Sequence, residues 1–133
     1  MDYKEKVEYL YGYKRKMAQI ASIIEEHERW MTIGTKVTQM FNADFCGGGG
    51  GSNRIERAGI ELSKIDAELE QAIEERDVIV RVIRTRSKYP RYADLLEMRF
   101  IGGMSYNRIA DVIDKDVRTV QRVMRKAIDT LEI

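Results

Sequence analysis

The strongest constraint on the fold is the apolar spacing between Asn53 and Arg86, where hydrophobic side chains recur at near-heptad intervals over about four heptads. A helix with this spacing needs a long partner to cover its apolar stripe. The segment from Asp2 to Ile33 also places apolar residues three and four positions apart, which predicts a second long helix. The two segments predict an antiparallel helical hairpin, or one half of a bundle that a second copy completes. The apolar positions after Asn53 are Ile55, Gly59, Leu62, Ile65, Leu69, Ala72 or Ile73, Val80 and Ile83.

The composition agrees with an all-α fold. Of the 133 residues, 34% are charged, 44% are hydrophobic and one is proline, which suits exposed helices better than a turn-rich β domain. This length allows one domain or two small ones and excludes a barrel enzyme or a two-lobed kinase. No apolar stretch approaches the roughly 18 residues of a membrane span, and the segment from Met1 to Lys6 lacks the apolar core of a signal peptide. We therefore expect a cytoplasmic protein with no membrane partner.

A linker is predicted between the two long segments, from Gly34 to Ser52. Its glycine run, Gly47 to Gly51, is entropically costly to order and predicts flexible coil. A natural loop and an engineered Gly/Ser linker both fit this run. Ser52 or Asn53 is expected to cap the helix that follows. The single cysteine, Cys46, excludes an internal disulfide and a zinc site built from several cysteines.

A new unit is predicted to begin near Pro90, because the residue before a proline is biased away from helix. The predicted domains are therefore residues 1–88, a helical scaffold or dimerisation region with the linker inside it, and residues 89–133. In the second domain a short amphipathic helix is expected to stop at Gly102 and Gly103. Ser105 is expected to cap the next helix, which ends in a tight turn at Asp114 and Lys115, and Asp116 to cap the last one. The apolar stripe of that last helix is Val117, Val120, Val123, Met124, Ala127, Ile128 and Leu131.

The last helix is locally basic although the net charge of the chain is only +1. No acidic residue lies between Val117 and Ile128. Two short helices that cross steeply, are joined by a short turn and carry the basic residues on the second one form a helix-turn-helix. The predicted core of this motif leaves one set of side chains on the outer face, where they can enter a major groove: Arg118, Thr119, Gln121, Arg122 and Arg125.

The segment from Tyr92 to Leu131, about a third of the chain, resembles the promoter-reading region four of sigma factors. The matching positions are Leu96, Arg99 to Gly103, Ser105-Tyr106, Ile109-Ala110, Arg118-Thr119-Val120, Arg122 and the ending from Ala127 to Leu131. The long helical part and glycine-rich linker ahead of it are similar in layout to bacteriophage late-gene transcription activators of the ArpU/RinA kind. The resemblance implies a sequence-specific regulator that binds double-stranded DNA at promoters and activates phage or prophage genes.

The resemblance also implies a role for each matching residue. Its base-reading positions are Arg118, Thr119, Gln121 and Arg122. Arginine can donate two hydrogen bonds to guanine and glutamine can pair with adenine, which agrees with this division. Two features depart from the family: Arg108 stands where many relatives have Glu, and Asp114 where they often have Gly. Acidic Asp111, Asp114 and Asp116 oppose close DNA approach on the turn side. The positions implied to contact the DNA backbone are Ser105, Tyr106, Arg108, Arg125 and Lys126.

The expected partners are DNA, a second copy bound through the long helices, and RNA polymerase. The competing prediction is a sigma-like interaction module that contacts RNA polymerase or another regulator without reading bases. No acid–base pair, activated nucleophile or phosphate loop is recognisable, so we expect no enzyme and no cofactor. His27 is the only histidine, and its neighbouring glutamates point around different sides of a helix, so we expect no metal site.

Overall fold

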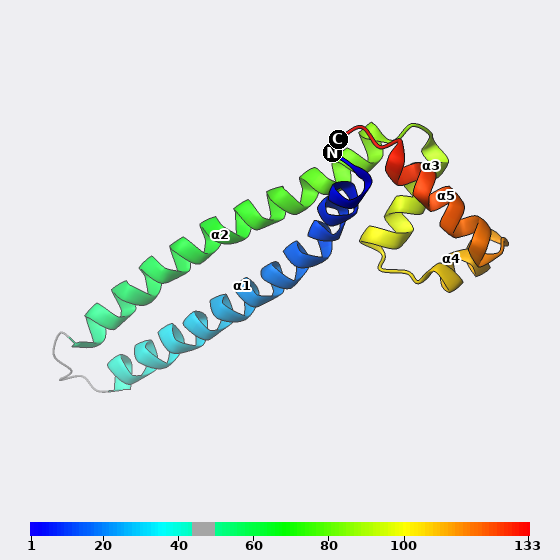
Figure 1. Cartoon of the computed structure of the whole chain (residues 1–133). Helices are drawn as coiled ribbons and strands as arrows, with labels where there is room; N and C mark the ends of the chain where they lie inside the picture. The colour runs from blue at the N-terminus through cyan, green and yellow to red at the C-terminus, as the bar shows by residue number, and fades with distance from the viewer. Residues whose placement is uncertain (44–49) are drawn as a thin grey trace. The chain divides into compact units, whose positions relative to one another are not determined.

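The computed structural model describes the backbone of residues 1–43 and 50–133 and the side chains of residues 1–36 and 55–133. Every regular element in these ranges is a helix (Figure 1), which confirms the predicted all-α class. The elements are α1 (Tyr3–Ala43), α2 (Gly50–Arg86), α3 (Pro90–Leu96), the π-helical turn η1 (Glu97–Ile101), α4 (Tyr106–Ile113) and α5 (Val117–Asp129). None of the described helices is both long and apolar enough to cross a membrane.

Both bounds predicted for the linker, Gly34 and Ser52, are wrong. Helix α1 continues through Gly34 to Ala43, and α2 already begins at Gly50, so neither Ser52 nor Asn53 caps it. A single glycine costs a helix only about 1 kcal/mol. Cys46 lies outside the described residues.

The short helices also differ in one detail from the prediction. The segment after Pro90 is not one uniform helix, because α3 widens into η1, where the Gly102 amide donates to the Glu97 carbonyl at 2.8 Å. The helical path nevertheless ends at Gly102 and Gly103, as predicted. Gly103 has a φ of +66°, a conformation that favours glycine.

The described chain divides into two compact units. Unit 1 contains Met1–Met17 and Glu74–Ile133, and unit 2 contains Ala18–Ile73. This division differs from the predicted boundary at residues 88 and 89, because residues at the start of α1 and the end of α2 share one core with the short helices. The short helices therefore share their hydrophobic core with the two ends of the long ones.

The core of unit 1 fixes the position of α4 and α5. Leu10 of α1 and Ile83 of α2 are fully buried, with an exposed fraction of 0%. Two polar contacts also link the long helices to the shorter elements. The Lys6 ammonium of α1 donates to the Asp129 carbonyl of α5 at 2.8 Å, and Arg84 Nε of α2 donates to Glu97 Oε1 of η1 at 2.7 Å. The rest of this core comes chiefly from the short helices and the end of the chain: Tyr92, Leu95, Leu96, Phe100, Ile109, Val120, Met124, Ala127, Ile128 and Leu131.

Unit 2 consists of the adjoining parts of α1 and α2, which run antiparallel (Figure 1) and form the hairpin that the heptad spacing predicts. Its small core contains Ile20, Ile23, Ile65 and Ala72. Trp30, Leu69 and Ile73 are only partly buried against this core. His27 Nε2 lies 3.4 Å from Asp66 Oδ1 on the opposite helix. A two-helix unit of this kind leaves much of its apolar surface uncovered.

Candidate nucleic-acid interface

The turn between α4 and α5 has the local geometry that the sequence predicts. The Ser105 hydroxyl accepts a hydrogen bond from the Arg108 amide at 3.2 Å and caps α4. Asp114 ends α4 in the left-handed region, with φ 55° and ψ 50°. Asp116 Oδ1 accepts a hydrogen bond from the Thr119 amide at 2.9 Å and caps α5. The two predicted caps and the predicted turn residue are thus confirmed.

The Asp116 carboxylate is held in its ionised form. Hydrogen bonds from the Thr119 side chain and amide lower the pKa of Asp116 below its ordinary value of 3.8, and the nearby Arg122 guanidinium lowers it further. Asp116 is therefore a carboxylate at neutral pH, at the N-terminus of α5, where the helix dipole favours negative charge. This cap sets where α5 begins and hence which of its residues face outward.

We expect Asp116→Ala to lower the melting temperature at neutral pH, because the α5 cap is lost. A lowered pKa in the folded state means that the charged cap stabilises the fold above the ordinary pKa, and that this stability disappears as the pH falls through the folded-state pKa. The difference in melting temperature between wild type and Asp116→Ala should therefore shrink below about pH 4. Asp116→Asn, which caps without titrating, is the control. If the difference is the same at every pH, the charge of Asp116 contributes nothing to the cap.

Helix α5 has two distinct faces. Val120, Met124, Ala127 and Ile128 are buried, and Val117 and Val123 are half-buried, which confirms the predicted apolar stripe. The opposite side chains are exposed, at positions i, i+3, i+4, i+7 and i+8, which share one side of a helix. We call this surface the basic face of α5, and it comprises Arg118, Gln121, Arg122, Arg125 and Lys126.

Of the other predicted contact residues, two are half-buried and two are exposed. Thr119 is half-buried and bonded to Asp116, so its side chain is engaged in the cap. Tyr106 is half-buried under the Arg99 guanidinium, which lies 4.3 Å from its ring centroid. The Ser105 hydroxyl is used by the α4 cap, whereas Arg108 is exposed. The structure therefore brings the basic face of α5 and Arg108 to the surface, half-buries Thr119 and Tyr106, and leaves Ser105 exposed with its hydroxyl in the α4 cap.

Two residues of the site region are absent from the sequence-based set. Tyr3 lies beneath Arg125, whose guanidinium carbon is 5.3 Å from the Tyr3 ring centroid. Burial raises the pKa of Tyr3 above its ordinary value. Arg99 donates to the Met104 carbonyl at 3.0 Å and so holds the segment before α4. Tyr3 and Leu10 are seven residues apart and so share one face of α1, but nothing in the sequence shows that this face meets the short helices.

The exposed acids Asp111 and Asp114 lie near the turn and limit the basic surface on that side. Within the described residues, no group of three or more His, Cys, Asp or Glu side chains is arranged to hold a metal ion. The exposed side chains of α5 give unit 1 a cationic surface, and such a charge favours a polyanion.

Comparison with family models, curated proteins and solved structures gives no match to this chain. The resemblance to sigma region four therefore stays a prediction carried by sequence motifs, and the resemblance to phage late-gene activators one carried by the layout of the chain.

Proposed function

We propose that this protein is a sequence-specific regulator of transcription that reads double-stranded DNA with the basic face of α5. The observation that carries this proposal is the exposure of Arg118, Gln121 and Arg122 on one side of a helix whose other side is buried. A helix presented in this way can lie in a major groove without unfolding any part of its core. In this proposal α4, the turn and α5 form a helix-turn-helix.

The basic face divides into base-reading and backbone-contacting positions. Arg118 and Arg122 are one helical turn apart, so both can reach base edges on the same stretch of duplex. Gln121 lies between them and offers the donor and acceptor pair that matches adenine. Arg125, Lys126 and the α4 residue Arg108 lie further along or beside the helix, where they can neutralise phosphates. Thr119 helps to position α5 through its hydrogen bond to Asp116, and it can also contact a base.

The biological role in the proposal is activation of phage or prophage genes, with α5 on a promoter element and RNA polymerase recruited beside it. Selection of bound duplexes from a random pool tests the base reading. The proposal predicts enrichment of one short motif containing guanine, and affinity for it that falls with salt. If the pool is bound without enrichment while RNA polymerase is still retained, the competing interaction module is correct.

We also propose that two copies associate through the long helices. One helix-turn-helix reads only a few base pairs, whereas a dimer can read two half-sites about 34 Å apart. Ile33 and Ile60 of unit 2 support this proposal, since they are 44% and 56% exposed. Each of these side chains can add apolar area to a contact with another protein surface.

We expect the double variant Ile33→Ser and Ile60→Ser to weaken self-association about tenfold or more, because two apolar contacts per protomer are lost. Sedimentation velocity over a dilution series measures the change. Val112→Ser, which alters a 58% exposed residue of α4, is the control and should leave association unaltered. A wild-type chain that sediments as a monomer at every concentration contradicts the dimer.

A further inference from the structure

A pocket of about 450 Å³ lies within unit 1, lined by the first part of α1, by η1 and by the glycines that follow η1. This volume is in the range of small-molecule sites, about 300–1,000 Å³. The lining residues that carry the argument are Tyr11, Lys14, Arg99, Phe100 and Gly103. None of the side chains that line the pocket is acidic.

The pocket offers an aromatic surface that is held in place. The Tyr11 ring packs in a T-shaped arrangement with the buried Phe100 ring, and their centroids are 5.2 Å apart. The Tyr11 hydroxyl also accepts a hydrogen bond from Arg99 Nη2 at 3.5 Å. Tyr11 is nevertheless 37% exposed, so a ligand in the pocket can reach its ring. A ring fixed in this way loses little side-chain entropy when a flat ligand stacks on it.

The Arg99 guanidinium is half-buried and has no carboxylate partner in the part of the chain that the structure describes. Its contacts are all neutral. It donates to the Met104 carbonyl at 3.0 Å and to the Tyr11 hydroxyl, and it lies over the Tyr106 ring. These contacts fix the position of the guanidinium without balancing its charge. A cation held in this way favours an anionic ligand, to which it can donate further hydrogen bonds.

Lys14 and Gly103 complete the pocket from α1 and from the segment after η1. Lys14 is exposed, and no carboxylate of the described residues lies within ion-pair distance of its ammonium. A Cβ atom added at Gly103 would meet nothing within 4 Å, so a ligand can come close to the backbone there. The pocket thus combines an aromatic ring, two cations and an open stretch of backbone.

Nearby acidic residues do not cancel this positive charge. Glu8 and Glu97 each stand three positions before a lining residue, and Asp77 adjoins Arg76, whose guanidinium nitrogen Nη1 lies 3.7 Å from Met17 Sδ. Each of these carboxylates already has an arginine partner. The pairs are Glu8 with Arg15 at 3.5 Å, Glu97 with Arg84 at 2.7 Å and Asp77 with Arg76 at 3.0 Å.

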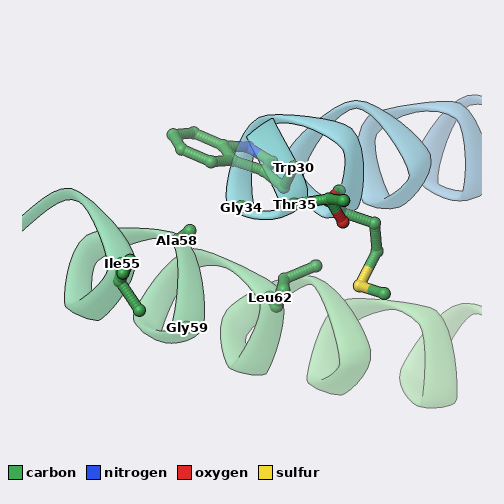
Figure 2. Close-up of a pocket in the computed structure, with 8 residues that line it drawn as sticks. Trp30, Gly34, Thr35, Ile55, Ala58, Gly59 and Leu62 are labelled. Atoms are coloured by element: carbon green, nitrogen blue, oxygen red, sulfur yellow. The ribbon is translucent and has the colours of Figure 1, made fainter. Parts of the chain in front are cut away.

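The hollow between α1 and α2 within unit 2 provides a contrast (Figure 2). Trp30 and Leu62 are among its lining residues, and none of the side chains around it is charged. The pocket of unit 1 differs because its aromatic ring lies beside cations.

We propose that the pocket of unit 1 binds a nucleoside monophosphate, with the base stacked on Tyr11 and the phosphate held by Lys14 and Arg99. Stacking on an aromatic side chain suits any nucleobase. A terminal phosphate carries about −1.5 to −2 charge at pH 7, which two cations can balance, whereas each phosphodiester of a strand carries a single charge. The charge of the pocket therefore favours a free nucleotide over a strand.

The pocket is separate from the basic face of α5, since the two surfaces share no residue. Nucleotide binding here and DNA reading by α5 therefore succeed or fail independently.

Amide chemical shifts of the full chain test this site, with adenosine monophosphate as the probe. We expect saturable shifts at Gly102 and Gly103, while the amides of Gly34 and Gly59, in the uncharged hollow of unit 2, stay unaltered. Adenosine and inorganic phosphate, titrated separately, should each bind at least about tenfold more weakly, because each makes only one of the two sets of contacts.

Three variants separate the contact to the phosphate from the contact to the base. Lys14→Ala should weaken adenosine monophosphate about tenfold and leave adenosine unaltered, because it removes a charged partner of the phosphate. Tyr11→Leu should weaken both ligands alike, because it removes the stacking surface. Lys4→Ala removes an exposed cation of α1 that does not line the pocket, and this control should bind as wild type does. Circular dichroism checks that each variant keeps its helices.

Several outcomes overturn the proposal. Unaltered Gly102 and Gly103 amides at millimolar adenosine monophosphate exclude the site, and equal affinity for adenosine removes the role of the cations. An equal loss in Lys4→Ala and Lys14→Ala makes the effect of charge unspecific. A single-stranded tetranucleotide that shifts the same glycines at lower concentration than adenosine monophosphate makes a strand the occupant.

Discussion

Replacing Arg118 and Arg122 together with alanine abolishes the discrimination between a selected target duplex and a random one, if α5 reads bases. Each bidentate contact contributes about 1–3 kcal/mol of discrimination, so the double variant should bind its target at least about thirtyfold more weakly. Both side chains are exposed and neither belongs to the core, so the fold should be unaffected. Fluorescence anisotropy with both duplexes at several salt concentrations measures the loss.

Lys126→Ala is the matched control for this experiment, since Lys126 is an exposed cation on the same helix. This substitution should weaken binding to the target and to the random duplex alike. It should also reduce the slope of log affinity against log salt concentration by about one. If the double variant instead retains its preference for the target, base reading lies elsewhere. If it loses RNA polymerase association while DNA affinity is unaltered, the protein is an interaction module.

Leu10→Ala is expected to destabilise unit 1 by about 2–5 kcal/mol, the usual cost of removing a fully buried leucine side chain and leaving a cavity. Leu10 lies near the start of α1, far in sequence from the short helices, yet its exposed fraction is 0% and it packs in their core. The change should also weaken DNA binding near the unfolding midpoint, because α5 shares this core. Urea unfolding of the full chain, followed by circular dichroism, gives the free energy.

Val112→Ala provides the comparison for Leu10→Ala, because it also shortens an aliphatic side chain in a helix of unit 1, at a position that is 58% exposed. It should change the free energy of unfolding by less than about 0.5 kcal/mol. Equal and small effects of the two substitutions would mean that the short helices are stable without α1, as the predicted boundary at residues 88 and 89 requires.

The sequence predicts local features of this fold well, because they depend on neighbouring residues. Ser105, Asp114 and Asp116 have side chains suited to caps and left-handed turns, and each occupies the predicted position. The apolar stripe of α5 follows a helical period and is buried as expected. The exposure of Arg118 and Arg122 follows directly from that stripe, since the opposite face of a helix is then fixed.

Features that depend on distant residues were harder to predict. Nothing near Leu10 in the sequence indicates that the start of α1 completes the core of unit 1 with residues such as Leu96 and Ile128. The stacking of Arg125 on Tyr3 joins positions from opposite ends of the chain. The predicted linker begins too early and ends too late, since a single glycine such as Gly34 is tolerated inside a long helix and α2 already begins at Gly50.

Backbone amide chemical shifts of the full chain, recorded as a selected target duplex is added, test the central claim most directly. The account predicts that the largest changes fall on α5 from Arg118 to Lys126 and on the start of α4 near Arg108. Changes confined to Ala18–Ile73, or none along α5 at saturating duplex, would contradict it.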